Sequence, residues 1–554
     1  MIRRRLPAIL FGLGMLICLL QIFVPRFFLT GDGPVHVYNA AILSDLWHNR
    51  NTGFWSGFYY LNPDVSPNWS GHVLLALLME VFSPVVAEKV LVALYALLFA
   101  GGFARLCKKL NPASGKYLSL AGLLFILSYP VFKGFYNFSL SMALCLWVIW
   151  QFLHVFEKHN ARNITALAAL TWLCFFSHPV GWLYALLFCG SVLFFHLLKP
   201  AHRNRRALAL TGIVAAINLP LVLFLVLFMG RGETPSLAFD LSRLTTLHRF
   251  DALLSYTTAE DYWMKLAGMI LLIATIPALF RAGKNLPYHY GASISVLLVS
   301  LGIYLLFPDF FSGGGVFVVR AQLFFFLFCV LLIAASGLKR GLKNALGLTF
   351  FALFLVLSSI RFPTQVSASE GVTDLLSVAP HIHPNSVVLP LSFDHGGQTT
   401  DGKMILNRNW AFIHASDYLG AQKPLIMLDN YEANTHHFPL KWVEAKNPFT
   451  YLSAYESIEG RPPYGNIETY RDKYGVTIDY IVLWCYDTVF LDQGHTRQLM
   501  EQVYRNYNLV YTSPTRRTLL YEKKPVVQPQ PLPVQPNVPR KIISDETLKL
   551  LNGE

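Results

Sequence analysis

The chain has 554 residues, of which 54% are hydrophobic, 14% aromatic and only 14% charged. This composition is too apolar for a soluble enzyme of this length and indicates an integral membrane protein. The net charge of +13 does not indicate nucleic-acid binding, because the basic residues form short clusters between apolar runs instead of one basic surface. The seven cysteines are scattered along the chain, which excludes a disulfide scaffold.

Eleven apolar stretches are long enough to cross a bilayer. The first follows three arginines and has no small-residue cleavage site, so it is interpreted as an uncleaved signal anchor. The predicted spans are residues 6–29, 85–106, 117–132, 135–156, 163–177, 179–198, 207–229, 263–281, 287–307, 316–336 and 343–360. Residues 72–82 are apolar but too short to span alone, and an interfacial or re-entrant helix is expected there.

The basic clusters between these spans predict the orientation of the chain in the membrane. They are centred on Arg105, Lys158, Arg205, Arg281 and Lys339. If the N-terminus is cytoplasmic, every one of these clusters faces the cytoplasm, as the positive-inside rule requires. The loop 30–84, the loop 230–262 and everything after residue 361 are then expected outside the cytoplasm.

The composition changes to a soluble pattern at about residue 362. Short β-rich runs occur at residues 386–391, 424–428, 478–484 and 509–511, with helical patterns near 466–474 and 495–507. Three regions are therefore predicted: a transmembrane domain at 1–361, an extracytoplasmic α/β domain at 362–525 and a Pro-rich tail at 526–554. The fold class is a polytopic α-helical membrane protein of about eleven spans with a C-terminal extracytoplasmic α/β domain.

The first outer loop is the richest candidate site, because acids and histidines there alternate with aromatic residues. Asp32, His36 and Asp64 are its candidate functional residues, and carboxylates beside aromatic rings are typical of sugar recognition. Pro34 favours the start of a helix that runs to about residue 48. In that register Asp32 lies just before the helix cap, which leaves its carboxylate free, although Asp32 could instead be the N-cap itself. His36 could equally be an interfacial histidine.

Four more residues at the outer membrane boundary are candidate ligands of a lipid phosphate: Lys133, His178, Arg231 and Arg320. Arg320 lies about one turn inside an apolar helix, where an arginine requires an anion or a buried acid. A structural pair with Asp309 or Glu80 is the alternative. Lys133 could simply extend its ammonium toward water. No Walker, Rossmann, HExxH or CxxC pattern is present, and no metal ligand is assigned.

This layout resembles the GT-C fold of polytopic glycosyltransferases, which includes protein O-mannosyltransferases and aminoarabinose transferases. The shared features are a basic start, one span, a long outer loop with an early acid, a helical membrane core and an outer C-terminal domain. Asp32 occupies the position of the essential acid in that class. It is followed here by Gly33 and Pro34, whereas the mannosyltransferases and aminoarabinose transferases have a second acid.

The resemblance implies a membrane glycosyltransferase in a bacterial inner or plasma membrane. Such an enzyme moves a sugar from a polyprenyl-phosphate carrier to a glycan, lipid or protein acceptor outside the cytoplasm, with Asp32 as base and a divalent metal as an open question. Its partners are the lipid-linked donor, the acceptor and membrane lipids, and no nucleic acid. Two alternatives stay open: a transferase of another group, and a transporter or assembly subunit of envelope glycan synthesis without catalysis.

Overall fold

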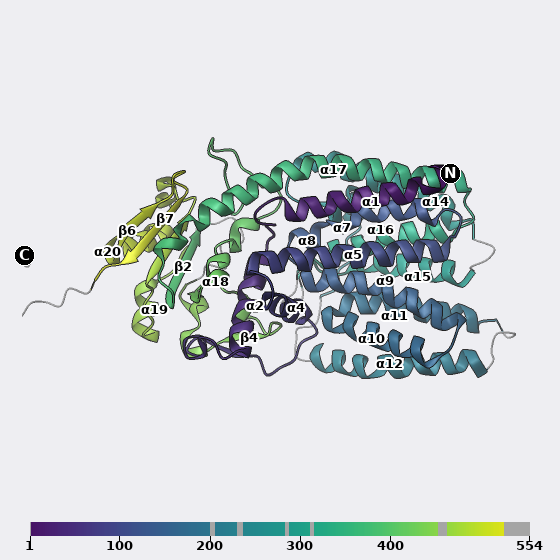
Figure 1. Ribbon diagram of the computed structural model, residues 1–554, viewed down its shortest axis with the longest axis horizontal. Helices are drawn as coiled ribbons and strands as arrows, with labels where there is room; N and C mark the ends of the chain where they lie inside the picture. Colours follow the sequence, from purple (N-terminus) through teal and green to yellow (C-terminus); the bar gives the residue numbers. More distant parts are fainter. Residues whose placement is uncertain are drawn as a thin grey trace, which may run out of the picture.

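The computed structural model describes residues 2–199, 205–229, 236–282, 287–310, 315–452 and 463–525. A long bundle of apolar helices adjoins a smaller α/β domain at one end (Figure 1). The N-terminal helix α1 (Ile2–Phe23) begins at the opposite end of the bundle. The two ends of the bundle are termed the domain-proximal end, next to the α/β domain, and the distal end, where α1 begins.

Within the described residues, ten helical segments are long and apolar enough to cross a membrane. A further helix, α10, has 17 residues and packs against α9 and α12 in the same bundle. The continuous bundle helices are α1, α5 (Pro84–Leu110), α9 (Tyr136–Glu157), α10 (Ala161–Ser177), α11 (Pro179–Leu197), α12 (Arg205–Met229), α14 (Asp261–Leu279), α15 (Pro287–Leu306), α16 (Phe317–Ala335) and α17 (Arg340–Leu375). The predicted fold class of a polytopic helical membrane protein is confirmed.

One predicted span, residues 117–132, is not a regular helix. It consists of the short segments α6 (Gly115–Leu118), η1 (Ser119–Gly122), α7 (Leu123–Ile126) and α8 (Tyr129–Phe132). This broken segment is buried among α1, α5 and α17, which can pair the backbone groups that a break leaves free. Its C-terminal end delivers Lys133 to the domain-proximal end.

The basic clusters meet at the distal end. The Lys109 ammonium lies 2.5 Å from the Glu157 carboxylate, and Arg206 donates to the Glu157 carbonyl. Lys343 likewise donates to the Ser336 carbonyl, at 2.7 Å. The clusters that the charge rule assigns to the cytoplasm therefore lie together, at the end of the bundle away from the α/β domain. The assignment of that end to the cytoplasm stays a prediction.

The α/β domain is built on a five-stranded sheet of order β3-β2-β5-β7-β6. Its strands are β2 (Ser386–Ser392), β3 (Leu425–Met427), β5 (Tyr480–Trp484), β6 (Tyr507–Thr512) and β7 (Thr518–Lys523). β3, β2 and β5 are parallel, β7 is antiparallel to β5, and the edge strand β6 is antiparallel to β7. The helices α19 (Ile467–Tyr474) and α20 (Gly494–Asn506) occur where helical patterns are predicted. The four predicted strands are present, whereas β7 was not predicted.

The first loop is part of the contact between the bundle and the α/β domain. Its strand β1 (Tyr59–Leu61) pairs antiparallel with β4 (Leu440–Trp442). Its helix α2 (Gly33–Trp47) packs against α18 (Asp417–Gln422), with α3 (Thr52–Ser56) after it. The helix α4 (Ser70–Met79) has only ten residues and lies at the domain-proximal end, where an interfacial or re-entrant helix was expected (Figure 1).

α17 connects the bundle to the α/β domain without a break. It has 36 residues and continues past residue 362, where the predicted soluble region starts. Arg361 on this helix is 4% exposed and its Nε lies 2.7 Å from the carboxylate of Glu260, which is 1% exposed. The guanidinium also donates to the carbonyls of Leu127 and Leu253. One buried ion pair therefore fastens α17 to the start of α14 and to the broken segment.

Arg361→Met is expected to lower the free energy of unfolding by about 3–5 kcal/mol, because it leaves the buried Glu260 carboxylate without its counter-charge. Thermal unfolding in detergent measures the loss. Arg340, an exposed arginine at the distal end, offers a control, and Arg340→Met should leave stability nearly unchanged. The double variant Arg361→Met/Glu260→Leu should lose less than the single one, and a larger loss would contradict this account.

Candidate functional site

The backbone around Asp32 is held against the segment that follows α8. The amides of Gly31 and Asp32 donate to the carbonyls of Phe132 and Lys133 at 3.0 and 2.9 Å. Gly134 then turns away with φ +84°, and a Cβ at that position would lie 2.5 Å from the backbone nitrogen of Gly33. Only glycine suits both the positive φ and this approach. The early acid is therefore fixed to the membrane bundle at the domain-proximal end.

The Asp32 carboxylate is not used to cap α2. The helix begins at Gly33, and Asp32 occupies the N-cap position without a side-chain capping bond. The hydroxyl of Thr30 accepts from the Gly33 amide instead, at 3.1 Å. Burial raises the pKa of Asp32, and the positive charges of His36 and Lys133 oppose this shift. The half-buried carboxylate is thus available for chemistry.

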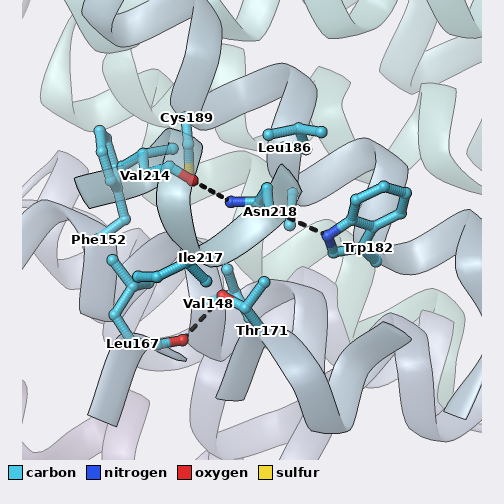
Figure 2. Close-up of a pocket in the computed structure, with 11 residues that line it drawn as sticks. Val148, Phe152, Leu167, Thr171, Trp182, Leu186, Cys189, Val214, Ile217 and Asn218 are labelled. Carbon is cyan, nitrogen blue, oxygen red and sulfur yellow. Dashed lines mark hydrogen bonds between the residues drawn. The ribbon is translucent and has the colours of Figure 1, made fainter. Parts of the chain in front are cut away.

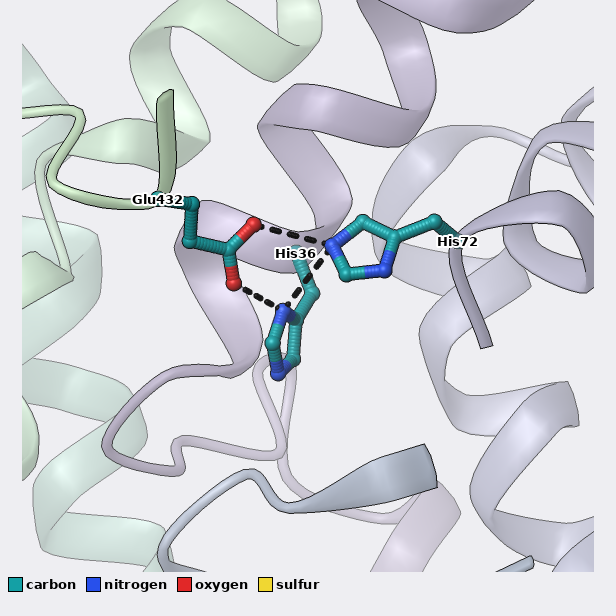
Figure 3. Close-up of side chains that lie close together, drawn as sticks. All are labelled: His36, His72 and Glu432. Atoms are coloured by element: carbon teal, nitrogen blue, oxygen red, sulfur yellow. Dashed lines mark hydrogen bonds and ion pairs between the residues drawn. The ribbon is translucent and has the colours of Figure 1, made fainter. Parts of the chain in front are cut away.

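Two histidines of the first loop meet one glutamate of the α/β domain. Figure 3 shows the imidazoles of His36, from α2, and His72, from α4, both directed at the Glu432 carboxylate. His36 Nδ1 forms an ion pair with Oε1, and His72 Nε2 lies 2.9 Å from Oε2. The two ring nitrogens are 3.2 Å apart. Asn39 supports the carboxylate by donating to Oε2 at 2.6 Å.

The pKa values of the two imidazoles shift in opposite directions because their surroundings differ. Burial lowers the pKa of His36, but the negative charges of Glu432 and Asp32 outweigh burial, and the pKa is raised overall. At His72 burial prevails over Glu432 and lowers the pKa. Burial raises the pKa of Glu432, but the two histidines outweigh burial. The pKa is lowered overall, so the carboxylate is ionised. Of the two imidazoles, His36 therefore holds a proton more tightly than His72 does.

Arg320 lies near the domain-proximal start of α16 without an ion-pair partner within 4 Å among the described residues. Its guanidinium is enclosed by the rings of Phe135, Phe138 and Phe317, at 4.6, 5.1 and 5.4 Å. Its Nε is buried and makes no hydrogen bond. Of the two alternative partners that the sequence suggests, Glu80 pairs with His48 at 2.9 Å instead. Asp309 acts on Arg320 electrostatically, more strongly than Asp32 does, but forms no ion pair with it within 4 Å.

His178 faces this arginine from the N-terminus of α11. Its Nδ1 accepts from the Val180 amide at 3.2 Å, which places the proton of a neutral ring on Nε2. Nε2 lies 3.3 Å from Nη1 of Arg320. Burial lowers the pKa of His178 well below its ordinary value, and the charge of Arg320 lowers it further, so the ring is neutral. Two N–H donors therefore face each other, an arrangement that an anion beside them, accepting from both, would stabilise.

The other predicted site residues have different surroundings. Lys133 is half-buried, interacts electrostatically with Asp32 and lies 5.8 Å above the ring of Tyr129. Burial lowers the pKa of Lys133, and Asp32 opposes that shift. Asp64 is exposed in the loop after β1, where it acts electrostatically on Lys441. Arg231 lies outside the described residues.

The sequence did not reveal Glu432. The available signal was its place in the chain, because Asp429, Asn430 and Glu432 directly follow the apolar run of β3. Polar residues just after the carboxyl end of a parallel strand mark the edge where ligands usually bind. His36, His72 and Glu432 together have the donor atoms of a metal site. A second such group in the α/β domain is described below.

A separate pocket lies inside the bundle among α9, α10, α11 and α12 (Figure 2). Asn218 is one of its polar residues, and its amide oxygen accepts from the Trp182 indole at 2.7 Å. Its amide nitrogen donates to the Val214 carbonyl at 2.8 Å, and the Thr171 hydroxyl donates to the Leu167 carbonyl. These polar groups are already paired, and no lining residue is charged. The pocket therefore offers no group for catalysis.

No protein-family model matches the chain, and a search of curated proteins found no match. Two solved structures to which the chain is similar are crystal structures of ArnT from Cupriavidus metallidurans. The apo structure aligns with a TM-score of 0.37 and 12% identity, over 92% of this chain and 97% of that chain. The structure bound to undecaprenyl phosphate aligns with a TM-score of 0.40 and 11% identity, over 93% and 97%.

The raised pKa of His36 predicts a pH-dependent contribution to stability. The folded chain binds this proton more tightly than the unfolded chain, so the stabilisation is present below about pH 6.5 and is lost as the pH rises through the folded-state pKa. The difference in Tm between the wild type and His36→Gln should therefore shrink from about pH 5 to about pH 9. EDTA in every sample keeps divalent cations from competing for the imidazole. A difference that grows with pH would contradict the assigned charge.

Proposed function

We propose that the chain is a membrane glycosyltransferase that moves a sugar from a polyprenyl-phosphate carrier to an acceptor outside the cytoplasm. One observation carries the proposal. Asp32, a carboxylate that caps no helix, interacts electrostatically with the buried guanidinium of Arg320 at one boundary of the membrane bundle, and Arg320 has no ion-pair partner within 4 Å among the described residues. Sugar transfer from a lipid phosphate needs a group of each kind, one for the acceptor hydroxyl and one for the departing phosphate.

The surroundings of Arg320 suit a phosphate that carries an apolar chain. The guanidinium lies in an apolar helix of the bundle, so an anion that reaches it must come from the membrane boundary. The Nε of Arg320 and the Nε2 proton of His178 are both available as donors. Phe135, Phe138 and Phe317 exclude water, which strengthens charge-assisted hydrogen bonds.

In this mechanism the acceptor oxygen forms a bond with the anomeric carbon while the bond from that carbon to the phosphate oxygen breaks. The electron pair leaves with the phosphate, where Arg320 and His178 stabilise the growing charge. The proton of the acceptor hydroxyl passes to Asp32. A single displacement of this kind inverts the anomeric carbon.

Lys133 and His36 adjust the base. Their positive charges partly offset burial, which raises the pKa of the Asp32 carboxyl overall. Lys133 also lies where it can meet a sugar hydroxyl or the phosphate. Asp64 and Arg231 are proposed to contact substrate at the edge of the site, as the sequence predicts, with Asp64 facing solvent.

Asp32→Asn tests the base. It keeps the side-chain shape and removes the proton acceptor, so kcat for transfer from radiolabelled polyprenyl-phosphate sugars should fall by about 10²- to 10⁴-fold. Tm should stay within a few degrees of the wild type, because Asp32 makes no capping bond. Asp492→Asn, at an exposed acid of the α/β domain, is the control and should keep full activity. Full turnover by Asp32→Asn would rule out this role.

Arg320→Lys tests the phosphate site separately from the base. Lysine keeps the charge but loses the planar fork of donors, so polyprenyl phosphate should bind at least about tenfold more weakly. Competition binding on the purified protein measures this without any turnover. Arg340→Lys, at an exposed distal arginine, should bind as the wild type does. If wild type and Arg320→Lys bind polyprenyl phosphate with equal affinity, the assignment of the phosphate to Arg320 is wrong.

A further inference from the structure

A second cluster of ionisable side chains lies wholly within the α/β domain. His414 ends the short helix η7 (Ala411–His414), Asp417 begins α18, and Asp429 follows β3. One potential ligand atom from each lies within 4.8 Å of the other two. The three residues are 5%, 0% and 6% exposed, respectively, so the cluster is enclosed by protein.

The atoms of this cluster lack the partners that buried polar atoms normally have. Nδ1 of His414, both carboxylate oxygens of Asp417 and Oδ1 of Asp429 are buried and make no hydrogen bond with any described residue. Oδ2 of Asp429 accepts from the Ser416 hydroxyl at 3.3 Å, and the carboxyl groups of Asp417 and Asp429 interact with each other. Each buried unpaired polar group costs about 1–3 kcal/mol, and an ionised carboxylate costs more. The unused positions on three side chains whose potential ligand atoms lie within 4.8 Å of one another point to a missing ligand.

The charge around the cluster points to a cation. No lysine or arginine of the described chain lies within 4 Å of either carboxylate, while Glu432 adds further negative potential to Asp417. Burial raises the pKa of Asp417, and the neighbouring Asp429 raises it further. Burial also raises the pKa of Asp429, to about 7. The protein itself therefore supplies no positive charge that would let both acids ionise.

The cluster of His36, His72 and Glu432 differs in this respect. There each imidazole already faces a carboxylate oxygen, and Asn39 donates to the same carboxylate. That cluster is held together by its own charges. The cluster in the α/β domain has two acids and one histidine, and no lysine or arginine of the described residues lies within 4 Å of either acid.

We propose that His414, Asp417 and Asp429 bind a divalent transition-metal ion, with Zn²⁺ or Mn²⁺ as the fitting ions. An imidazole nitrogen disfavours Mg²⁺ and Ca²⁺, which prefer oxygen ligands, and two carboxylates neutralise a divalent charge. Three protein ligands leave at least one position for water. The site is independent of the proposed transfer chemistry, because none of its residues belongs to the Asp32 or Arg320 groups.

The metal would fix the loop that carries Glu432. Asp429 is followed by Asn430, whose side chain donates to the Asn39 amide oxygen of α2 at 2.8 Å. Tyr38, also on α2, donates to the Leu425 carbonyl and accepts from the Met427 amide, at 2.7 and 3.1 Å. An ion at Asp417 and Asp429 would therefore join α18 to the end of β3, immediately beside the contacts that hold α2. Its role is structural: it sets the place of the α/β domain against the first loop.

The first experiment measures metal content in the full-length protein purified without chelators from medium containing Zn²⁺ and Mn²⁺. Elemental analysis should find about one equivalent per chain. After EDTA treatment, added Zn²⁺ or Mn²⁺ should raise the Tm of the wild type, since a ligand of the folded state stabilises it. Absence of bound metal and of any Tm shift in the wild type would overturn the proposal without recourse to a variant.

Two isosteric variants locate the ion. Asp417→Asn should bind the metal more than about a hundredfold more weakly, because losing a ligand costs more than losing a group that only orients one. Glu432→Gln, at the neighbouring cluster, is the matched control and should retain the metal. Loss of the ion in Glu432→Gln with retention in Asp417→Asn would assign it to His36 and His72 and overturn the proposal.

A spectrum of the wild type covers the case in which Asp417→Asn fails to fold. Co²⁺ added to the EDTA-treated protein should give visible absorption bands of a site with one nitrogen and several oxygen ligands. His414→Gln should change these bands, whereas His72→Gln should leave them as they are. Bands that respond only to His72→Gln would likewise place the ion elsewhere.

Discussion

The contact of Glu432 with His36 and His72 is the interaction on which the arrangement of the site depends. It joins a loop of the α/β domain to two helices of the first loop, and all three side chains are buried. A buried carboxylate is tolerated only with partners of opposite charge, so the first loop and the α/β domain must adopt their positions together. Asp32, four residues before His36, is thereby placed by both parts of the molecule.

The buried positive charges of the protein have two different kinds of surroundings. At His36 and Arg361 each cation is matched to a carboxylate, and the pair holds elements together. At Arg320 the cation is enclosed by aromatic rings and faces the neutral His178, with no acid within 4 Å among the described residues. A structural arginine inside a membrane normally has a partner, so an arginine without one indicates a ligand. The paired cations hold the fold together, whereas Arg320 is the basis of the proposed phosphate site.

The sequence predicted the features that depend on short stretches of chain. Apolar length identified the eleven bundle segments, and alternation identified four strands of the sheet. Arg320 and His178 were found because a charge inside an apolar helix and a histidine between two of them are local anomalies. Glu432, His414 and Asp417 were missed because single acids and histidines in a soluble domain are common. The meaning of Glu432 comes from contacts such as that with Asn39, 393 positions away in the chain, and that of His414 and Asp417 from a fold that brings them beside Asp429.

The same separation along the chain determines when the site can form during synthesis. At about 5–20 residues per second, a ribosome needs roughly 20–80 seconds to pass from the first loop to the loop that pairs with it. For that time His36 and Asn39 are outside the ribosome without their acid, while the bundle helices are inserted one after another. The candidate active site is consequently among the last parts of the protein to assemble, and a chain that stops before Glu432 would lack a buried partner for both histidines.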